Sequence, residues 1–250
     1  MSTPAIMTGG EELQPPRSFW SRWVGVYFSP AEAFQDIARK PDFILPLLVI
    51  ALSAIAITET MLAKVGMERI IRNSLEMSGR AAKMSAEQIQ QAVDQGKGVG
   101  SIIAHVAGVV GAPIYLLIVA VVGLVLVNAI FGSPISFKKA FSVTCYANLC
   151  GFVGALMALA MILFGDLEHF NPENPSPTNV GFFLNPLETS KPLLTFASSF
   201  DLFTIWFVVL LGIGFSQATG GKVKALSMSL VYFGLWTIWV LGKVGLAAIF

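Results

Sequence analysis

The sequence has little charge for its length. Only 12% of its 250 residues are Asp, Glu, Lys or Arg, about half the share that is usual in soluble domains, and the formal net charge is +1. Such a chain lacks the basic field that attracts nucleic acid, so we expect no nucleic-acid partner. It also has no glycosylation sequon, because Pro175 blocks the candidate that begins at Asn174.

Metal-binding and catalytic residue patterns are also scarce. Cys145 and Cys150 lie five residues apart without a CxxC spacing, and we interpret them as small apolar fillers at a helix contact. One histidine stands among scattered carboxylates in a segment that we interpret as a solvated acidic loop: Asp166, Glu168, His169 and Glu173. There is no GxSxG, GxGxxG or plausible triad, so we expect no catalytic residue, no metal and no cofactor.

The N-terminal residues 1–16 carry Gly, Pro, Thr and two Glu. They show no basic region followed by an apolar core, and we therefore expect no cleavable signal peptide. Neither end of the sequence carries a lipidation motif. We predict a disordered tail over 1–16 and one membrane domain over 17–250.

Apolar residues are abundant instead: they make up 55% of the chain, and the mean hydropathy is +0.72. They are concentrated in five long stretches, at about 43–61, 101–131, 141–164, 201–217 and 225–249. About 20 apolar residues span the hydrocarbon of a bilayer as a helix, and lipid offers the backbone no hydrogen-bond partner. The stretches are continuous rather than alternating, which excludes a barrel. We predict an all-α membrane protein, a bundle of five transmembrane helices.

Aromatic residues recur at helical spacing before the first stretch, within Arg17–Phe28. Trp and Tyr favour the headgroup level, so we predict a helix that lies in the membrane interface. A second short helix follows; Ser29 and Glu32 predict a capping box and Pro30 fits its first position.

Other local signals concern the connections. Ser85 and Gln88 predict a capping box that opens a helix ending near Asp94, before a glycine-rich stop. The proline-rich residues 171–177, within the segment 165–199, are predicted to form an irregular loop. The second stretch is too long for a perpendicular span and contains Pro113, so we expect a kinked or tilted helix, or a first turn or two outside the hydrocarbon. Small-residue rows centred on Gly108 and Gly151 predict that spans two and three pack together.

The sequence indicates the orientation of the chain in the membrane only weakly, because Lys and Arg are nearly evenly divided between the segments on the two sides. We expect the N-terminus in the cytoplasm, since the arm has no export signal and both short loops on that side carry paired lysines. Five spans then place the C-terminus outside.

Four ionisable residues lie within or at the ends of the apolar stretches: Glu59, His105, Asp201 and Lys243. A charge inside the bilayer is costly and commonly functional. Counting along each helix places all four near the outer rim. They either form a polar cluster, with Lys243 paired to Asp201 or Glu59, or extend separately to the headgroups while Asp201 caps a helix.

The chain resembles the Yip family (Ypt/Rab-interacting-protein domain). The resemblance covers about Phe19 to the C-terminus and is carried by loose motifs in a characteristic order: Phe28-Ser29-Pro30 with Phe34, Phe137 to Tyr146, Asp201 to Trp206, Gly212-Ile213-Gly214 and the paired lysines that follow. Cys150 stands where many members have a proline. The resemblance implies five passes, a cytoplasmic N-terminus and no catalytic residue.

Eukaryotic members of that family are linked to Rab GTPases and to traffic between endoplasmic reticulum and Golgi, but the short arm here looks more like that of prokaryotic members. We therefore expect a bacterial cytoplasmic membrane, with an endoplasmic reticulum or Golgi membrane as the alternative. The expected function is a non-enzymatic organiser or scaffold that contacts the lipid bilayer and an unknown protein partner or a second copy of itself. A small transporter or channel component with an outer-rim polar site is the alternative.

Overall fold

The computed structural model describes residues 16–165, 171–172, 174–186 and 188–249. The predicted tail over 1–16 and the acidic residues Asp166, Glu168, His169 and Glu173 therefore lie almost wholly outside the described residues. Regular structure in the described part is helical, apart from an isolated bridge between Asn179 and Asp201. The chain is all-α.

The main helices in chain order are α1 (Phe19–Phe28), α2 (Pro30–Arg39), α3 (Ile44–Lys64), α4 (Met67–Met77), α5 (Ala86–Val125), α6 (Phe137–Asn148), α7 (Phe152–Phe164), α8 (Lys191–Ser199), α9 (Leu202–Ala218) and α10 (Ala225–Ile249). Short turns are η1 (Ala81–Lys83), η2 (Leu126–Ile130), η3 (Leu149–Gly151) and η4 (Val180–Phe183).

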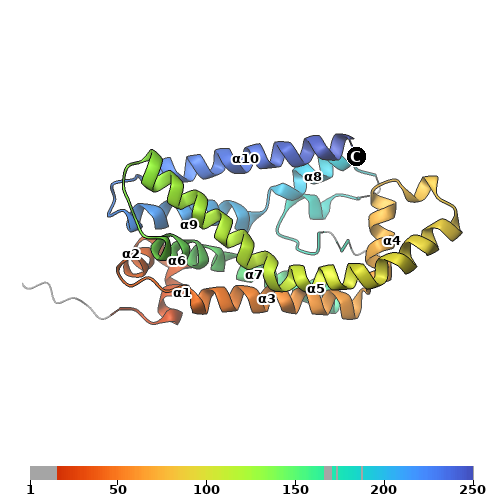
Figure 1. Cartoon of the computed structure of the whole chain (residues 1–250), viewed down its shortest axis with the longest axis horizontal. Helices are drawn as coiled ribbons and strands as arrows, with labels where there is room; N and C mark the ends of the chain where they lie inside the picture. The colour runs from red at the N-terminus through yellow and green to blue at the C-terminus, as the bar shows by residue number, and fades with distance from the viewer. Residues whose placement is uncertain (1–15, 166–170, 173, 187, 250) are drawn as a thin grey trace, which may run out of the picture.

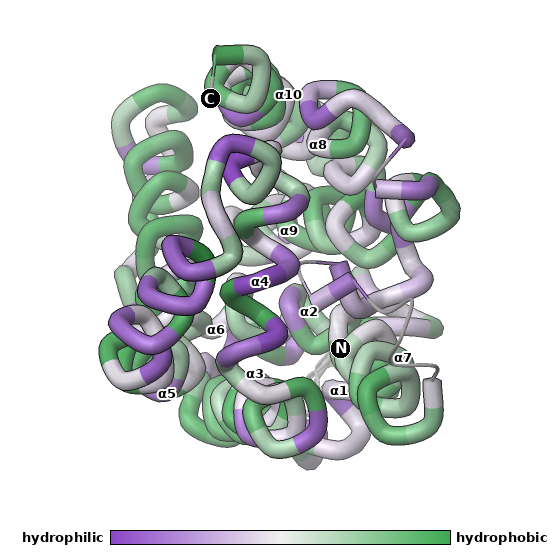
Figure 2. Tube along the Cα trace, turned by 90° about the vertical axis from the view of Figure 1, so that its right-hand side faces the viewer, coloured by the Kyte–Doolittle hydropathy of each residue, from purple (hydrophilic) through white to green (hydrophobic). Residues whose placement is uncertain are grey.

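The long helices run roughly along one axis, and the short ones cover the two ends of the bundle (Figure 1). Helices α1 and α2 lie at one end, whereas α4 and the end of α10 lie at the other. Figure 2 looks onto the α4 end, where hydrophilic α4 lies across a ring of largely hydrophobic helices. The hydropathy of the bundle thus changes along its axis as expected for a protein that crosses a membrane.

Four helical segments are long and apolar enough to span a membrane: Ile44–Lys64, Ala86–Ile130, Phe137–Phe164 and Ala225–Ile249. Three of them match predicted spans to within about four residues at either end, and the segment Ala86–Ile130 covers the predicted span 101–131 to within one residue but begins earlier. The remaining predicted span, at 201–217, corresponds to the shorter apolar helix α9, which has 17 residues. At 1.5 Å per residue it extends about 25 Å.

Helix α5 is longer than predicted. Its capping box forms as predicted, since Ser85 Oγ accepts from the Gln88 backbone N–H and the Gln88 side chain accepts from the Ser85 N–H. The predicted stop near Asp94 is wrong, because the helix continues without a break through the glycines to Val125. Figure 1 shows α5 changing direction midway, and Pro113 lies inside it, as the predicted kink requires.

One other local prediction is corrected. Ser29 is the N-cap of α2 and Pro30 its first residue, but the Ser29 side chain makes no capping bond, and Glu32 instead pairs with Arg17. The described residues of 171–177 form no helix or strand, in agreement with the predicted irregular loop, and η4 and α8 follow them.

The third span is interrupted where α6 gives way to the short turn η3 before α7 begins. Cys145 and Cys150 flank this interruption, and both are buried and free. Their burial agrees with their interpretation as apolar fillers.

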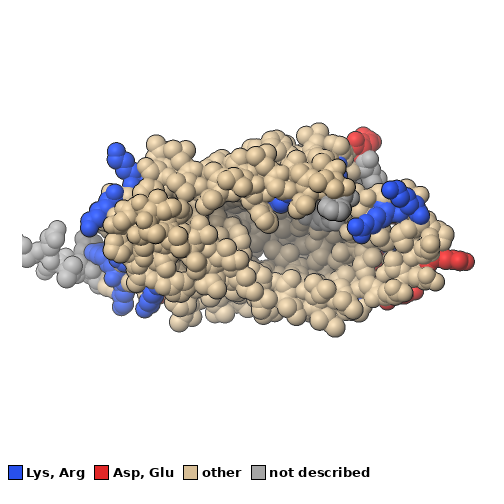
Figure 3. All heavy atoms as spheres, turned by 45° about the horizontal axis from the view of Figure 1, so that its top comes forward, with Lys and Arg blue, Asp and Glu red and all other residues tan. Residues whose placement is uncertain are grey.

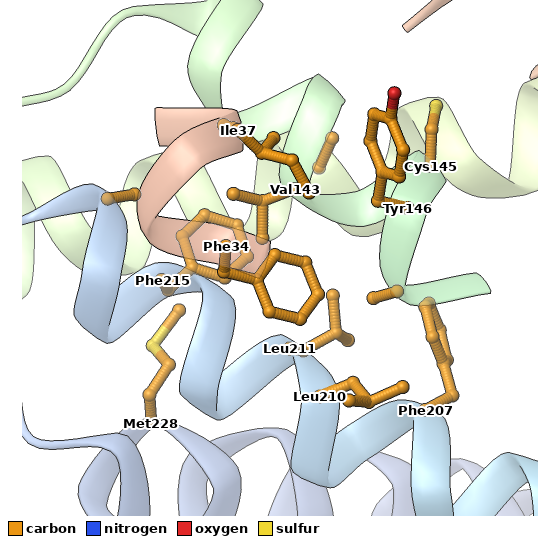
Figure 4. Packing of buried hydrophobic residues seen from close by; sticks show 14 of the residues in the cluster. Phe34, Ile37, Val143, Cys145, Tyr146, Phe207, Leu210, Leu211, Phe215 and Met228 are labelled. Atoms are coloured by element: carbon orange, nitrogen blue, oxygen red, sulfur yellow. The ribbon is translucent and has the colours of Figure 1, made fainter. Parts of the chain in front are cut away.

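The hydrophobic core is concentrated in the half of the bundle that carries α1 and α2 (Figure 4). Phe34 of α2 points between Val143 of α6 and Phe215 of α9. A Cβ added to Gly214 would lie 2.5 Å from Val143 Cγ1 and 3.1 Å from Phe34 Cδ1, so α9 approaches both neighbours closely. Helix α2 is therefore part of the packed bundle.

The predicted pairing of spans two and three holds for α5 and α6, which pack together. The small-residue row centred on Gly108, however, does not make this contact. A Cβ on Gly108 would lie 2.7 Å from Thr58 Oγ1, so this row faces α3.

Candidate functional site

A buried ionic cluster joins the two N-terminal helices. Arg22 of α1 is 2% exposed, and its Nε donates to Asp36 Oδ2 of α2 at 2.8 Å. Asp36 also accepts from the Arg17 backbone N–H at 3.2 Å and from Arg39 Nη2 at 3.2 Å. An ion pair removed from water needs several such bonds, and this carboxylate has them.

The same arginine ties these helices to the bundle. Its Nη1 donates to the Lys40 carbonyl at 3.1 Å and pairs with Asp42, which in turn accepts from the Tyr146 hydroxyl of α6 at 2.8 Å. Burial alone would lower the pKa of Arg22, but hydrogen bonds with Asp36 and Tyr146 and the charges of Asp42 and Asp36 raise it. The guanidinium stays charged and holds α1, α2 and α6 in one geometry.

The opposite face of α1 is apolar and uncovered. Trp20, Val24 and Phe28 follow one another at four-residue spacing, and their exposed fractions are 66%, 57% and 84%. Residues four apart share a helix face, so these three form one stripe, the α1 stripe. The inner face carries Arg22, Gly25 and Val26, all buried.

Basic side chains collect around this end of the molecule. Figure 3 shows mainly Lys and Arg there, whereas the α4 end shows both signs of charge. Five lysines contribute to this basic end, and within the described part of the chain none of them forms an ion pair: Lys40, Lys138, Lys139, Lys222 and Lys224. The basic end therefore has uncompensated positive charge available to a partner.

The four ionisable residues predicted to lie at the outer rim do not share one set of contacts. Glu59 and His105 contact each other, whereas Asp201 and Lys243 each have other partners. Glu59 of α3 and His105 of α5 are brought together, with 3.3 Å between Oε1 and Nε2. His105 Nδ1 lies 2.6 Å from the Ser101 carbonyl oxygen, and because a carbonyl only accepts, Nδ1 must be the donor. Both side chains are about half exposed.

Asp201 is the N-cap of α9. Its Oδ1 accepts from the Thr204 backbone N–H at 2.8 Å, and Oδ2 accepts from the Thr178 hydroxyl. Lys243 of α10 donates from Nζ to Ser199 Oγ at 3.0 Å. Among the described residues no ion pair links Lys243 to Asp201 or Glu59, so the single four-residue cluster remains a prediction.

Two cavities adjoin these residues, and Figure 3 shows the surface hollowed between the core and the α4 end. One, of about 450 Å³, lies against Asp201 and is also lined by Tyr115, Asn148 and Thr178. The other, of about 570 Å³, lies against Lys243. Both volumes are in the range of small-molecule sites.

Sequence reasoning missed the Arg22 cluster. None of Arg22, Asp36 and Asp42 is among the candidate residues found from the sequence. One signal was available: Asp36 lies between Ala33 and Ile37, on the apolar face of a short amphipathic helix. A carboxylate in that position needs a partner.

Comparison with known proteins places the chain in a family. The profile of the Yip1 domain matches residues 24–242. The chain is also similar to the membrane protein YknW of Bacillus subtilis (strain 168), with 28% identity over 246 residues that cover 96% of this chain and 95% of the relative. No solved structure matches the chain significantly. The chain therefore belongs to the Yip1 domain family of membrane proteins.

Proposed function

We propose that this protein is a non-enzymatic, five-pass organiser of the bacterial cytoplasmic membrane that recruits a protein partner at its basic end. The observation that carries the proposal is the buried Arg22–Asp36 ion pair, which fixes α1 and α2 on the bundle. A clamped helix pair presents its outer surface in one orientation and thus binds a partner at a lower entropic cost.

The α1 stripe supports the membrane part of this proposal. Trp20 and Phe28 are exposed beside a basic surface, and aromatic residues at such a position favour the boundary between headgroups and acyl chains. Helix α1 would lie in the inner leaflet with Arg22 turned toward the bundle.

The five lysines define the partner's chemistry. They leave positive charge at the end that carries the N-terminal helices, which corresponds to a cytoplasmic N-terminus under the positive-inside rule. An acidic surface on the partner would complement them. The C-terminus of α10, at the other end of the bundle, would then be outside (Figure 1).

Photo-crosslinking from the basic end tests recruitment. A photoreactive amino acid at Lys139 or Lys222 should capture a stoichiometric partner or a second copy, whereas the same probe at Ile103, on the exposed side of α5 in the other half, should not. Purification in mild detergent should recover the same species. Recovery of a lone monomer with no crosslink at any position would refute the recruiting role.

A transporter or channel component is the second candidate, favoured by the 450 Å³ cavity beside Asp201. Under this alternative, Asp201→Asn or Lys243→Gln should change the flux of a solute in reconstituted vesicles, with Lys83→Gln as an exposed control. Unchanged flux of every solute tested would remove this alternative.

A further inference from the structure

The larger cavity lies between α4, α8 and α10 at the end of the bundle opposite α1 and α2. Its volume is about 570 Å³. The polar part of its wall includes hydroxyl and ammonium groups from all three helices: Ser74, Ser78, Lys191, Thr195, Ser198 and Lys243. No Asp or Glu is found among the described residues that line it.

Lys243 of α10 lines this cavity. Its ammonium donates to the hydroxyl of Ser199, which is 6% exposed and itself donates to the Thr195 carbonyl at 2.8 Å. An ammonium has three N–H donors. Ser199 Oγ accepts from one of these N–H groups, and the other two have no acceptor among the described side chains and carbonyls. A cation at this depth needs an anionic partner or further acceptors.

The remaining lining groups can supply more donors. Lys191 begins α8 and has no carboxylate partner within the described ranges. Asn174 Nδ2 donates to Ser198 Oγ at 3.3 Å, which leaves the Ser198 hydroxyl hydrogen free to donate elsewhere. Two positive charges and several hydroxyl donors thus line one open cavity.

We propose that this cavity binds a phosphate-type oxyanion, with Lys243 as its principal cation. A phosphate group has several strong acceptor oxygens that a surrounding set of ammonium and hydroxyl donors can bind at once. The group belongs either to a phospholipid headgroup or to a free phosphate. Lys243 lies six residues before the end of α10 at Ile249, about 9 Å along the helix axis, so its side chain reaches the headgroup layer. The proposal does not depend on partner recruitment at the basic end.

Binding measured on the purified full chain tests the proposal. The probes are inorganic phosphate, followed by calorimetry, and phosphatidylglycerol or phosphatidylcholine, followed by native mass spectrometry. Lys243→Gln should raise the dissociation constant about tenfold or more, because a charge-assisted hydrogen bond is lost. Lys243→Arg should largely retain binding, and Lys83→Gln, which changes an exposed lysine near the same end, should leave it unchanged within twofold.

The outcomes discriminate clearly. Binding of phosphate alone identifies a free anion as the ligand, whereas binding of either lipid without phosphate identifies a headgroup. Either result supports the site when Lys243→Gln weakens the binding about tenfold or more. If Lys243→Gln does not fold, Ser198→Ala and Lys191→Gln should each weaken binding about threefold or more. The proposal is overturned if the wild-type protein binds none of the probes, or if the substitutions in the cavity weaken binding no more than Lys83→Gln does.

Discussion

The guanidinium Nε of Arg22 lies 2.8 Å from Oδ2 of Asp36, and both side chains are almost completely buried. The two residues belong to different helices, and the pair is completed by Asp42 and by the Tyr146 hydroxyl of α6. The N-terminal helices are therefore held on the bundle by a small number of buried polar bonds in addition to the apolar packing of Phe34.

Removal of one partner of this pair should be strongly destabilising. Asp36→Ala leaves a buried guanidinium without its main counter-ion, and we expect a loss of about 3–5 kcal/mol in the free energy of unfolding in detergent. The control Glu32→Ala removes the exposed pair with Arg17 and should cost less than about 1 kcal/mol. Equal effects of the two substitutions would contradict a structural role for the cluster.

Two glycines of α5 should respond oppositely to the same substitution. A Cβ at Gly123 would lie 2.2 Å from Phe215 Cζ and 2.4 Å from the Tyr232 hydroxyl, so Gly123→Ala should destabilise by about 1–3 kcal/mol. At Gly111 nothing lies within 4 Å of the added atom, and Gly111→Ala should be neutral or stabilising. Thermal unfolding of both variants is the measurement.

Cysteine labelling can establish the orientation, because Cys145 and Cys150 are buried and contribute little background. Lys222→Cys lies at the basic end, and Arg80→Cys lies at the α4 end. In intact cells an impermeant maleimide should label Arg80→Cys only; in inverted vesicles it should label Lys222→Cys only. Labelling of both from one side would contradict a membrane-spanning bundle, and the reverse pattern would place the N-terminus outside.

Contact between α4 and α5 should weaken in acid. Glu68 hydrogen-bonds with Lys97, at 2.7 Å, and with Arg72, and these bonds lower the pKa of the Glu68 carboxyl. A lowered folded-state pKa stabilises the fold above the ordinary pKa of Glu, and that contribution is lost as the pH falls through the folded value. Hydrogen exchange of α4 should therefore increase in acid, modestly because Glu68 is exposed, and Glu68→Gln should remove the pH dependence.

The spans were predictable because each depends on local composition. The predicted ends of the last span coincide with α10, and the first span differs from α3 by only a few residues. The end of the helix begun at Ser85 was not predictable in the same way. Glycine disfavours a helix by about 1 kcal/mol, and this is outweighed where α4 packs along α5 through Ile71 near Gly96 and Met67 near Gly100.

The candidate sites were less accessible to sequence reasoning, because they depend on which helices become neighbours. Glu59 and His105 were both expected near the outer rim and are close together, but the sequence suggested Lys243 and not His105 as a partner of Glu59. The partners of Arg22 could not be anticipated, since Tyr146 is more than one hundred residues away in the chain. Lys243 was singled out as a charge in an apolar stretch, but Ser199 gave no signal as its acceptor.

Helix α9, at about 25 Å, is shorter than the roughly 30 Å of hydrocarbon in a typical bilayer. Mismatch of this kind normally makes a membrane thin or a helix oligomerise. Much of α9 is buried among its neighbours, so longer helices such as α3 and α10 meet most of the acyl chains. If α9 crosses the bilayer, the segment around Thr178, which hydrogen-bonds with the N-cap Asp201, would occupy the shortfall at that end and would place hydrophilic groups below the lipid surface.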